Sequence, residues 1–261
     1  MLGIYRRLRK TLLDEGRLQK YLVYAIGEII LVVVGILIAL AINDRRHWKQ
    51  DREDEKIYLS RLVEDLNMDN VDIKAANLFA YKRIAISTWV LEQLGDSSAN
   101  FEPKFLLKNA DEIEPVNQNW TKDSLGLAIT RLMSARIFDH NEVTFQEMIS
   151  TSKIQVIQDL TLRSAINQHY VAARKALSTN NDVLLAQQNL VTALKSIGLT
   201  PNTLTAASDL VQQLKGNRQI VAELNYVRDM AVHHLHVFEQ PERGLYVKTA
   251  ALIQKINGTL K

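Results

Sequence analysis

Histidines near the C-terminus are the residues of this chain whose spacing could support metal chemistry. On a helix, His233 and His236 share one face with Asp229 or Glu239. Imidazole nitrogens and carboxylate oxygens are typical zinc ligands, so this face could hold an ion. The alternative is a set of partly exposed residues near the end of a helix, where imidazole suits the helix dipole. We expect no bound metal, with His233 and His236 as the candidate ligands if there is one.

Catalytic motifs are otherwise absent from the sequence. It contains no H-E-x-x-H, G-x-S-x-G, Walker or Rossmann fingerprint, and it has no cysteine. We interpret the stretch 139–142 as a loop before a helix, with Asn141 capping that helix. His169 and Tyr170 are expected on one face of a helix, where they pack against apolar neighbours and provide one polar group. The sequence therefore predicts neither an enzyme nor a cofactor, although an enzyme of unrecognised type, with a metal on the His233/His236 face, is an alternative.

The most apolar stretch of the chain, residues 22–42, contains a single carboxylate, Glu28. Its 21 residues would span about 31 Å as a helix, close to the thickness of a bilayer core. Fourteen of them are Leu, Ile or Val, which favours insertion by about 4–8 kcal/mol. One acid costs at most about 3.5 kcal/mol. We therefore predict a transmembrane helix over 21–43, with interfacial aromatic anchors at Tyr21, Tyr24 and Trp48.

Glu28 shares a helical stripe with Gly35 and Ala39. Gly35-x-x-x-Ala39 is a small-xxx-small pair, which allows another helix to approach closely. We expect this stripe to contact a second copy of the chain or a membrane-protein partner. The alternative is that Glu28, about 9 Å inside the span, extends toward the lipid headgroups or is protonated and inert.

Basic residues flank the predicted span on both sides. Residues 1–20 carry six Lys or Arg and form a basic amphipathic segment suited to an anionic membrane surface. With a net charge of only +3, the chain as a whole does not suggest nucleic-acid binding. We expect the bacterial inner membrane, with a cytoplasmic N-terminus and a periplasmic C-terminal domain. The alternatives are the reverse orientation, or cleavage after the small-x-small run at 39–41 and secretion.

Two blocks of the sequence resemble a known family. The segment KYLVYAIGEIILVVVGILIALAIND is similar to the opening of a Bacteroidota family of single-span membrane proteins, a domain of unknown function. The block from Phe145 to Asp159, with Leu162, Arg163 and Tyr170 after it, is similar to that family's F-x-E-L-x-S-[ST]-G-x-L-x-L-I-x-[DN] segment. Ser152 occupies the position of the family's glycine, where a tight turn between helices is expected. The resemblance implies an N-terminal anchor followed by a helical domain, and it implies no reaction.

Beyond the span, helical periodicity dominates the sequence. Residues 44–70 mix both signs of charge and are predicted to form a helical stalk, followed by a soluble bundle over 71–261. Because KIQVIQD would be an isolated strand, we predict a loop or turn there. The helices of the bundle are expected at 73–94, within 104–114, and at 124–136, 142–150, 160–197, 204–215, 218–239 and 245–260, with a possible break near 178–181.

The predicted fold class is therefore all-α: one transmembrane helix continuing into a bundle of about seven or eight helices. The function that fits best is a membrane-anchored interaction, scaffold or sensor protein whose partners are the bilayer and another membrane helix. An ion-coupled accessory subunit, with Glu28 exchanging protons beside a multi-span partner, is the alternative function.

Overall fold

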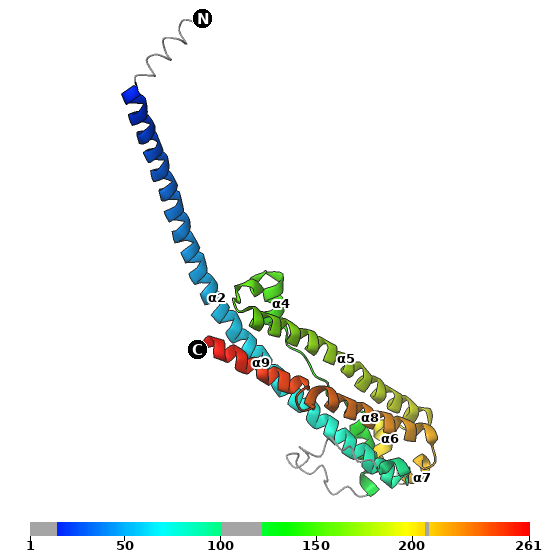
Figure 1. Cartoon of the computed structure of the whole chain (residues 1–261). Coiled ribbons are helices and arrows are strands. Elements are labelled where there is room, and N and C mark those ends of the chain that lie inside the picture. The colour runs from blue at the N-terminus through cyan, green and yellow to red at the C-terminus, as the bar shows by residue number, and fades with distance from the viewer. Residues whose placement is uncertain (1–14, 101–121, 207–208) are drawn as a thin grey trace, which may run out of the picture. The chain divides into compact units, whose positions relative to one another are not determined.

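The structure is a computed structural model that describes residues 15–100, 122–206 and 209–261, with side chains from residue 22 onward. Regular structure in these residues is entirely helical, which confirms the all-α prediction (Figure 1). Most of the basic segment 1–20, the side chain of Tyr21 and the helix predicted within 104–114 lie outside the described residues. The chain divides into two compact units, Met1–Lys56 and Ile57–Lys261.

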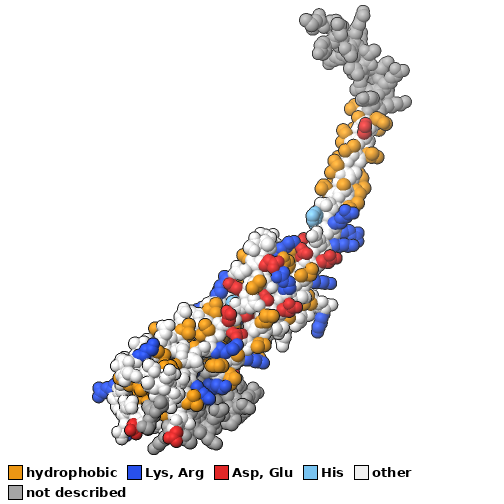
Figure 2. Space-filling model, turned by 180° about the vertical axis from the view of Figure 1, so that it is seen from behind, with side chains coloured by type: hydrophobic (Ala, Val, Ile, Leu, Met, Phe, Trp, Pro, Cys, Tyr) orange, Lys and Arg blue, Asp and Glu red, His pale blue; other side chains and the backbone are white. Residues whose placement is uncertain are grey.

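The first unit consists, where it is described, of the N-terminal part of helix α2 (Glu15–Gln93). All fourteen Leu, Ile and Val side chains between residues 22 and 42 are at least 46% exposed. Figure 2 shows them as a surface that is almost free of charge. Among the described helices, only α2 is long and apolar enough to cross a membrane, although an N-terminal signal sequence would have the same length and composition.

The second unit is a bundle built around three long helical segments. These are the C-terminal half of α2, helix α5 (Leu160–Ser196), and helix α8 (Arg218–Glu239) followed by α9 (Leu245–Leu260) (Figure 1). Shorter helices complete it: α3 (Leu125–Leu132), α4 (Val143–Ser150), α6 (Pro201–Ala206) and α7 (Leu210–Leu214). One apolar cluster joins the end of α2 to α3, α6, α7 and α8, and another joins its residues 59–66 to α4, α5 and α9.

Several predicted helix boundaries change in the structure. The helix expected at 73–94 is part of the continuous α2, and α5 has no break near residue 178. Residues 57–70, expected in the stalk, lie in the second unit, where Leu59, Leu62 and Leu66 are buried in its core. The helix predicted over 204–215 is instead represented by the short helices α6 and α7. The predicted bounds of α8 and α9 agree with the structure.

The segment between α4 and α5 is a turn, as predicted, and contains a short 3₁₀ helix at Lys153–Val156. Ser152 precedes it with φ of 59°, in the left-handed region that most side chains avoid. Asp159 ends the turn by accepting hydrogen bonds from the backbone N–H groups of Thr161 and Leu162, which caps α5.

Ser152→Gly is expected to stabilise the protein by about 0.5–1 kcal/mol, because glycine adopts positive φ without a steric penalty. Ser152→Val should destabilise it by more than that, since a β-branched side chain is poorly tolerated there. The measurement is the urea midpoint of unfolding of the detergent-solubilised chain, followed by circular dichroism. A valine variant as stable as the glycine variant would contradict the left-handed turn.

Candidate functional site: a buried carboxylate and histidine cluster

Three aspartates on α2 hold the segment that connects α3 to α4. Asp65, Asp69 and Asp72 are spaced by four and three residues, so they lie on one side of the helix. Asp65 accepts hydrogen bonds from the Asn141 side chain and the Thr144 backbone N–H, both at 3.1 Å. The carboxylates therefore provide partners for donors in a stretch that has no regular structure of its own.

The other two aspartates bind the middle of this segment. Asp69 Oδ1 accepts from the Asn141 backbone N–H at 2.8 Å, and Asp72 accepts from the Asp139 backbone N–H at 2.7 Å. Arg136 donates to the second oxygen of Asp72 at 2.7 Å. Together the three aspartates fix residues 136–144 against α2.

His140 completes the cluster from the centre of the docked segment. Its Nδ1 lies 2.7 Å from Asp69 Oδ2, and the exposed fractions of the two side chains are 1% and 2%. The carboxylate accepts the hydrogen bond when Nδ1 carries the proton, which leaves Nε2 directed elsewhere. On the opposite side of the segment, Asn180 of α5 bonds both the N–H and the carbonyl of Phe138. The segment is thus held between α2 and α5.

Helix α5 brings two further polar rings to His140. The ring centroids of His140 and Tyr170 are 5.3 Å apart, and those of His140 and His169 are 6.5 Å apart. Phe145 of α4 stacks on Tyr170 with centroids 4.0 Å apart. Four buried atoms here have no hydrogen-bond partner: His140 Nε2, both ring nitrogens of His169, and the Tyr170 hydroxyl. Such a concentration of unpartnered polar atoms is unusual in a protein core.

Burial controls the charge of these rings. The pKa of His169 is lowered to about 4, chiefly by burial and to a smaller extent by the nearby His140 and Lys248. Burial also raises the pKa of Tyr170, with added effects from Asp65, Asp69 and Glu142. At neutral pH, His169 is therefore neutral and Tyr170 is protonated, so each ring can both donate and accept a hydrogen bond.

The histidines expected as metal ligands lie elsewhere, on α8. His233 and His236 are exposed, whereas His234 between them is buried, 3.1 Å from Asn77 Oδ1 and stacked on Phe238. Glu239 accepts a hydrogen bond from Tyr81 at 2.6 Å. No group of three or more His, Asp, Glu or Cys residues in the described part of the chain is arranged to hold a metal ion.

The predicted membrane-contact residues lie in the first unit. Glu28, Gly35 and Ala39 are all exposed on α2, and Tyr24 and Trp48 are 72% and 58% exposed. A Cβ atom added at Gly35 would meet no atom within 4 Å. The stripe thus leaves room for an approaching helix.

The block that carries the family resemblance folds as one wall of the cluster. Phe145 stacks on Tyr170, and Glu147 accepts hydrogen bonds from Tyr58 and Arg61 of α2. Arg163 donates to the carbonyl oxygens of Gln155 and Ile157, which closes the turn before α5. Comparison of the chain with protein-family models, curated proteins and solved structures gives no match.

Sequence reasoning did not identify the three aspartates or His140 as a site. A signal for two of them was nevertheless present, because Asp65 and Asp69 fall on the same helical face as Leu62, Leu66 and Ile73. Acids on the apolar face of a helix require partners. No comparable pattern marked His140, whose partners come from other segments. The stretch 139–142 is a loop, as expected, but the residue at the N-cap of α4 is Glu142 and not Asn141, and Glu142 makes no side-chain capping bond. Asn141, one residue earlier, accepts a hydrogen bond from the Val143 N–H at 3.3 Å.

Removing the charge of Asp69 should strongly destabilise the second unit. We expect Asp69→Asn to lower the free energy of unfolding by about 3 kcal/mol, because the single oxygen of the amide cannot serve both His140 and the Asn141 N–H, and one of these groups loses its acceptor. Combined with His140→Gln, the double variant should lose about 1–2 kcal/mol less than the sum of the single variants. Urea unfolding of the four proteins of this cycle measures both effects.

Asp72→Asn is the matched control, since Asp72 pairs with an arginine that is 47% exposed. It should cost about 1 kcal/mol or less. Equal losses of unfolding free energy in Asp69→Asn and Asp72→Asn would contradict the central role of the His140–Asp69 pair.

Stability should fall as the pH decreases from about 6.5 to 4.5. The pKa of His169 and that of His234 are both lowered from 6.5 to about 4 in the folded protein, in each case chiefly by burial. In this window the unfolded chain binds protons that the folded chain does not, which favours unfolding. The full effect is on the order of 3 kcal/mol for each histidine once the pH approaches 4.

Thermal unfolding of the full chain at several pH values tests this expectation. His169→Leu should flatten the pH dependence, whereas His47→Leu, which removes an exposed histidine of the first unit, should leave it unchanged. Unaltered slopes in both variants would show that the loss arises from other groups.

Proposed function

We propose that this protein is a single-pass, membrane-anchored interaction or sensor protein, with a helical bundle outside the membrane. The observation that carries the proposal is the exposure of all fourteen Leu, Ile and Val side chains along residues 22–42 of α2, each by at least 46%. In water, so large an apolar surface would drive association or aggregation, whereas a bilayer covers it favourably. The resemblance of residues 20–44 to a family of single-span proteins supports the same reading.

The expected location is the bacterial inner membrane, with a cytoplasmic N-terminus. Six basic residues within residues 1–20 support this orientation. It places the second unit in the periplasm.

A role in helix association is supported by the stripe of Glu28, Gly35 and Ala39. The small residues at 35 and 39 permit close approach of a second helix, and that helix would shield Glu28 from lipid. We therefore propose that the span self-associates in addition to anchoring the chain. Glu28 and its counterpart in the second copy can then form a hydrogen bond if at least one of them is protonated.

A non-catalytic role is supported by the closed character of the polar cluster. The Asp69, His169 and Tyr170 residues are 1%, 5% and 0% exposed, so a substrate has no access to them in this conformation. Binding through the bundle is therefore the function that we favour.

Membrane anchoring is tested by alkaline extraction of membranes and intact mass measurement of the mature protein. We expect the chain to stay in the membrane pellet with residues 1–20 still attached. Release into the supernatant, or loss of residues up to about 41, would instead identify a cleaved signal sequence and contradict the anchor.

Self-association can be measured by cysteine cross-linking, because the chain has no natural cysteine. Ile42 follows Ala39 by three positions and so lies on the same stripe. The variant Ile42→Cys should therefore form a disulfide-linked dimer in membranes. Leu37→Cys, on the opposite face, should form much less. Adding Gly35→Leu to Ile42→Cys should abolish the dimer, because the larger side chain blocks the approach of the helices. Equal cross-linking at both positions would contradict the proposed stripe.

A further inference from the structure

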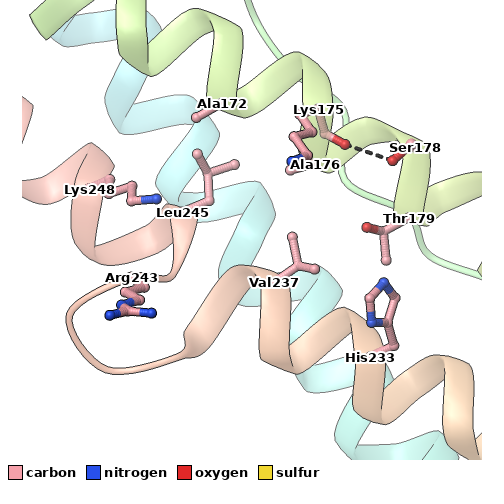
Figure 3. A pocket seen from close by; sticks show the side chains of 10 residues that line it. All are labelled: Ala172, Lys175, Ala176, Ser178, Thr179, His233, Val237, Arg243, Leu245 and Lys248. Atoms are coloured by element: carbon pink, nitrogen blue, oxygen red, sulfur yellow. Dashed lines mark hydrogen bonds between the residues drawn. The ribbon is translucent and has the colours of Figure 1, made fainter.

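A pocket of about 280 Å³ lies within the second unit, where α5, α8 and the start of α9 meet (Figure 3). It is separate from the carboxylate and histidine cluster, and His233, one of the two histidines expected as metal ligands, is among its lining residues. One wall is apolar and includes Val237 and Leu245. The remaining wall is polar and strongly basic.

Three cations line this pocket, and no acid does. They are Lys175 of α5, Arg243 of the α8–α9 loop and Lys248 of α9. None of the three side chains forms an ion pair within the described residues, whereas Arg61, Arg136 and Arg174 elsewhere in the bundle all have carboxylate partners. In Figure 3, the ammonium groups of Lys175 and Lys248 extend toward the space beside Leu245 from two sides. Their mutual repulsion is relieved when an anion lies between them.

A buried hydroxyl gives a second, independent indication of a ligand. Thr179 is only 3% exposed and lines the pocket, yet its hydroxyl makes no hydrogen bond to any described residue. Ser178 beside it is already used, because its hydroxyl donates to the Lys175 carbonyl. The Thr179 hydroxyl is therefore a buried donor that is available to a bound oxygen atom.

The start of α9 adds further positive potential. Its N-cap is Gly244, which has no side chain to cap the helix, and its first turn contains no acid. The first N–H groups of a helix, together with its dipole, favour an anion at that end. The 16-residue length of α9 is sufficient for this effect.

The loop that presents Arg243 is tightly folded. The Gly244 N–H donates to the Gln240 carbonyl at 2.7 Å. A Cβ atom at Gly244 would lie 2.7 Å from the Phe238 carbonyl oxygen and 2.8 Å from Gln240 atoms, so only glycine fits. Glu242 adopts a positive φ of 70° and does not line the pocket. The basic rim is thus a fixed part of the fold.

We propose that this pocket binds a small organic phosphate. Three uncompensated cations and a helix N-terminus match a dianionic phosphate monoester better than a single carboxylate. The Thr179 hydroxyl can donate to one phosphate oxygen, and Val237 and Leu245 can contact a short apolar group attached to the phosphate. The proposal concerns the second unit alone and does not depend on the membrane anchor.

Calorimetric titration of the full chain in phosphatidylcholine nanodiscs tests the proposal, with phenyl phosphate and inorganic phosphate as probes at constant ionic strength. We expect saturable binding, tighter for phenyl phosphate because of the apolar wall. Lys175→Gln and Lys248→Gln should each weaken it about tenfold, and Thr179→Val about threefold. Lys195→Gln removes the same charge from an exposed position on α5 outside the pocket, and should leave the affinity unchanged.

Two outcomes would overturn the proposal. The first is an equal loss of phenyl phosphate affinity in Lys195→Gln and Lys248→Gln, which would show that affinity depends on the overall charge of the protein and not on the pocket. The other is equal binding of benzoate and phenyl phosphate, which would remove the preference for a dianion. Competition with a soluble short-chain phosphatidic acid distinguishes a lipid headgroup from a free metabolite as the natural ligand. If phosphatidic acid displaces phenyl phosphate at a lower concentration than inorganic phosphate does, the ligand is a lipid headgroup. Otherwise it is a free metabolite. Unchanged circular dichroism of each variant excludes unfolding as the cause.

Discussion

The hydrogen bonds from Asp65, Asp69 and Asp72 to the segment 136–144 are the interaction on which the second unit depends. This segment connects α3 with α4, and therefore joins the two apolar clusters at the ends of the bundle. Its residues 136–142 belong to no helix, so their backbone donors need partners from elsewhere. Carboxylates are suitable partners, because each has two oxygens that can accept bonds from different donors. Without them, the connection would carry buried and unsatisfied N–H groups, which are costly in a core.

Burying carboxylates has a large cost, and the structure offsets it in a specific way. Asp69 is compensated by His140 and a backbone N–H, and Asp65 by an asparagine side chain and a backbone N–H. These bonds are directional, so they fix one register of the segment along α2, whereas apolar contacts tolerate small shifts. On the side of the cluster that faces α5, some buried polar atoms have no hydrogen-bond partner. They are Nε2 of His140, both ring nitrogens of His169 and the hydroxyl of Tyr170. The polar cluster thus specifies the position of the segment on the α2 side, whereas the polar groups on the α5 side are left without partners.

Helical periodicity predicted much of this fold because apolar residues at three- and four-residue spacing directly reflect burial. It located α5, α8 and α9 to within a residue or two. It identified residues 57–66 as helical, with leucines at 59, 62 and 66 at helical spacing, but dense charge of both signs led us to assign them to a solvated stalk, whereas these leucines are buried. It also could not find the polar cluster, because contacts such as His140 with Asp69 join residues 71 positions apart and leave no periodic signal. The pocket cations were missed for the same reason, since they come from two helices and a loop.

Lys248 connects the two polar regions of the second unit electrostatically. Its side chain lines the basic pocket, and its charge contributes to the lowered pKa of His169 in the cluster. An anion bound in the pocket would cancel part of that charge, so the pKa of His169 would move back toward its ordinary value. By linkage, protonation of His169 would in turn strengthen anion binding by the same free energy. The effect must be small near neutral pH, because burial is the larger cause of the shift and keeps His169 neutral. The charge of Lys248 thus acts on both the pocket and the cluster, and its effect on His169 is small beside that of burial.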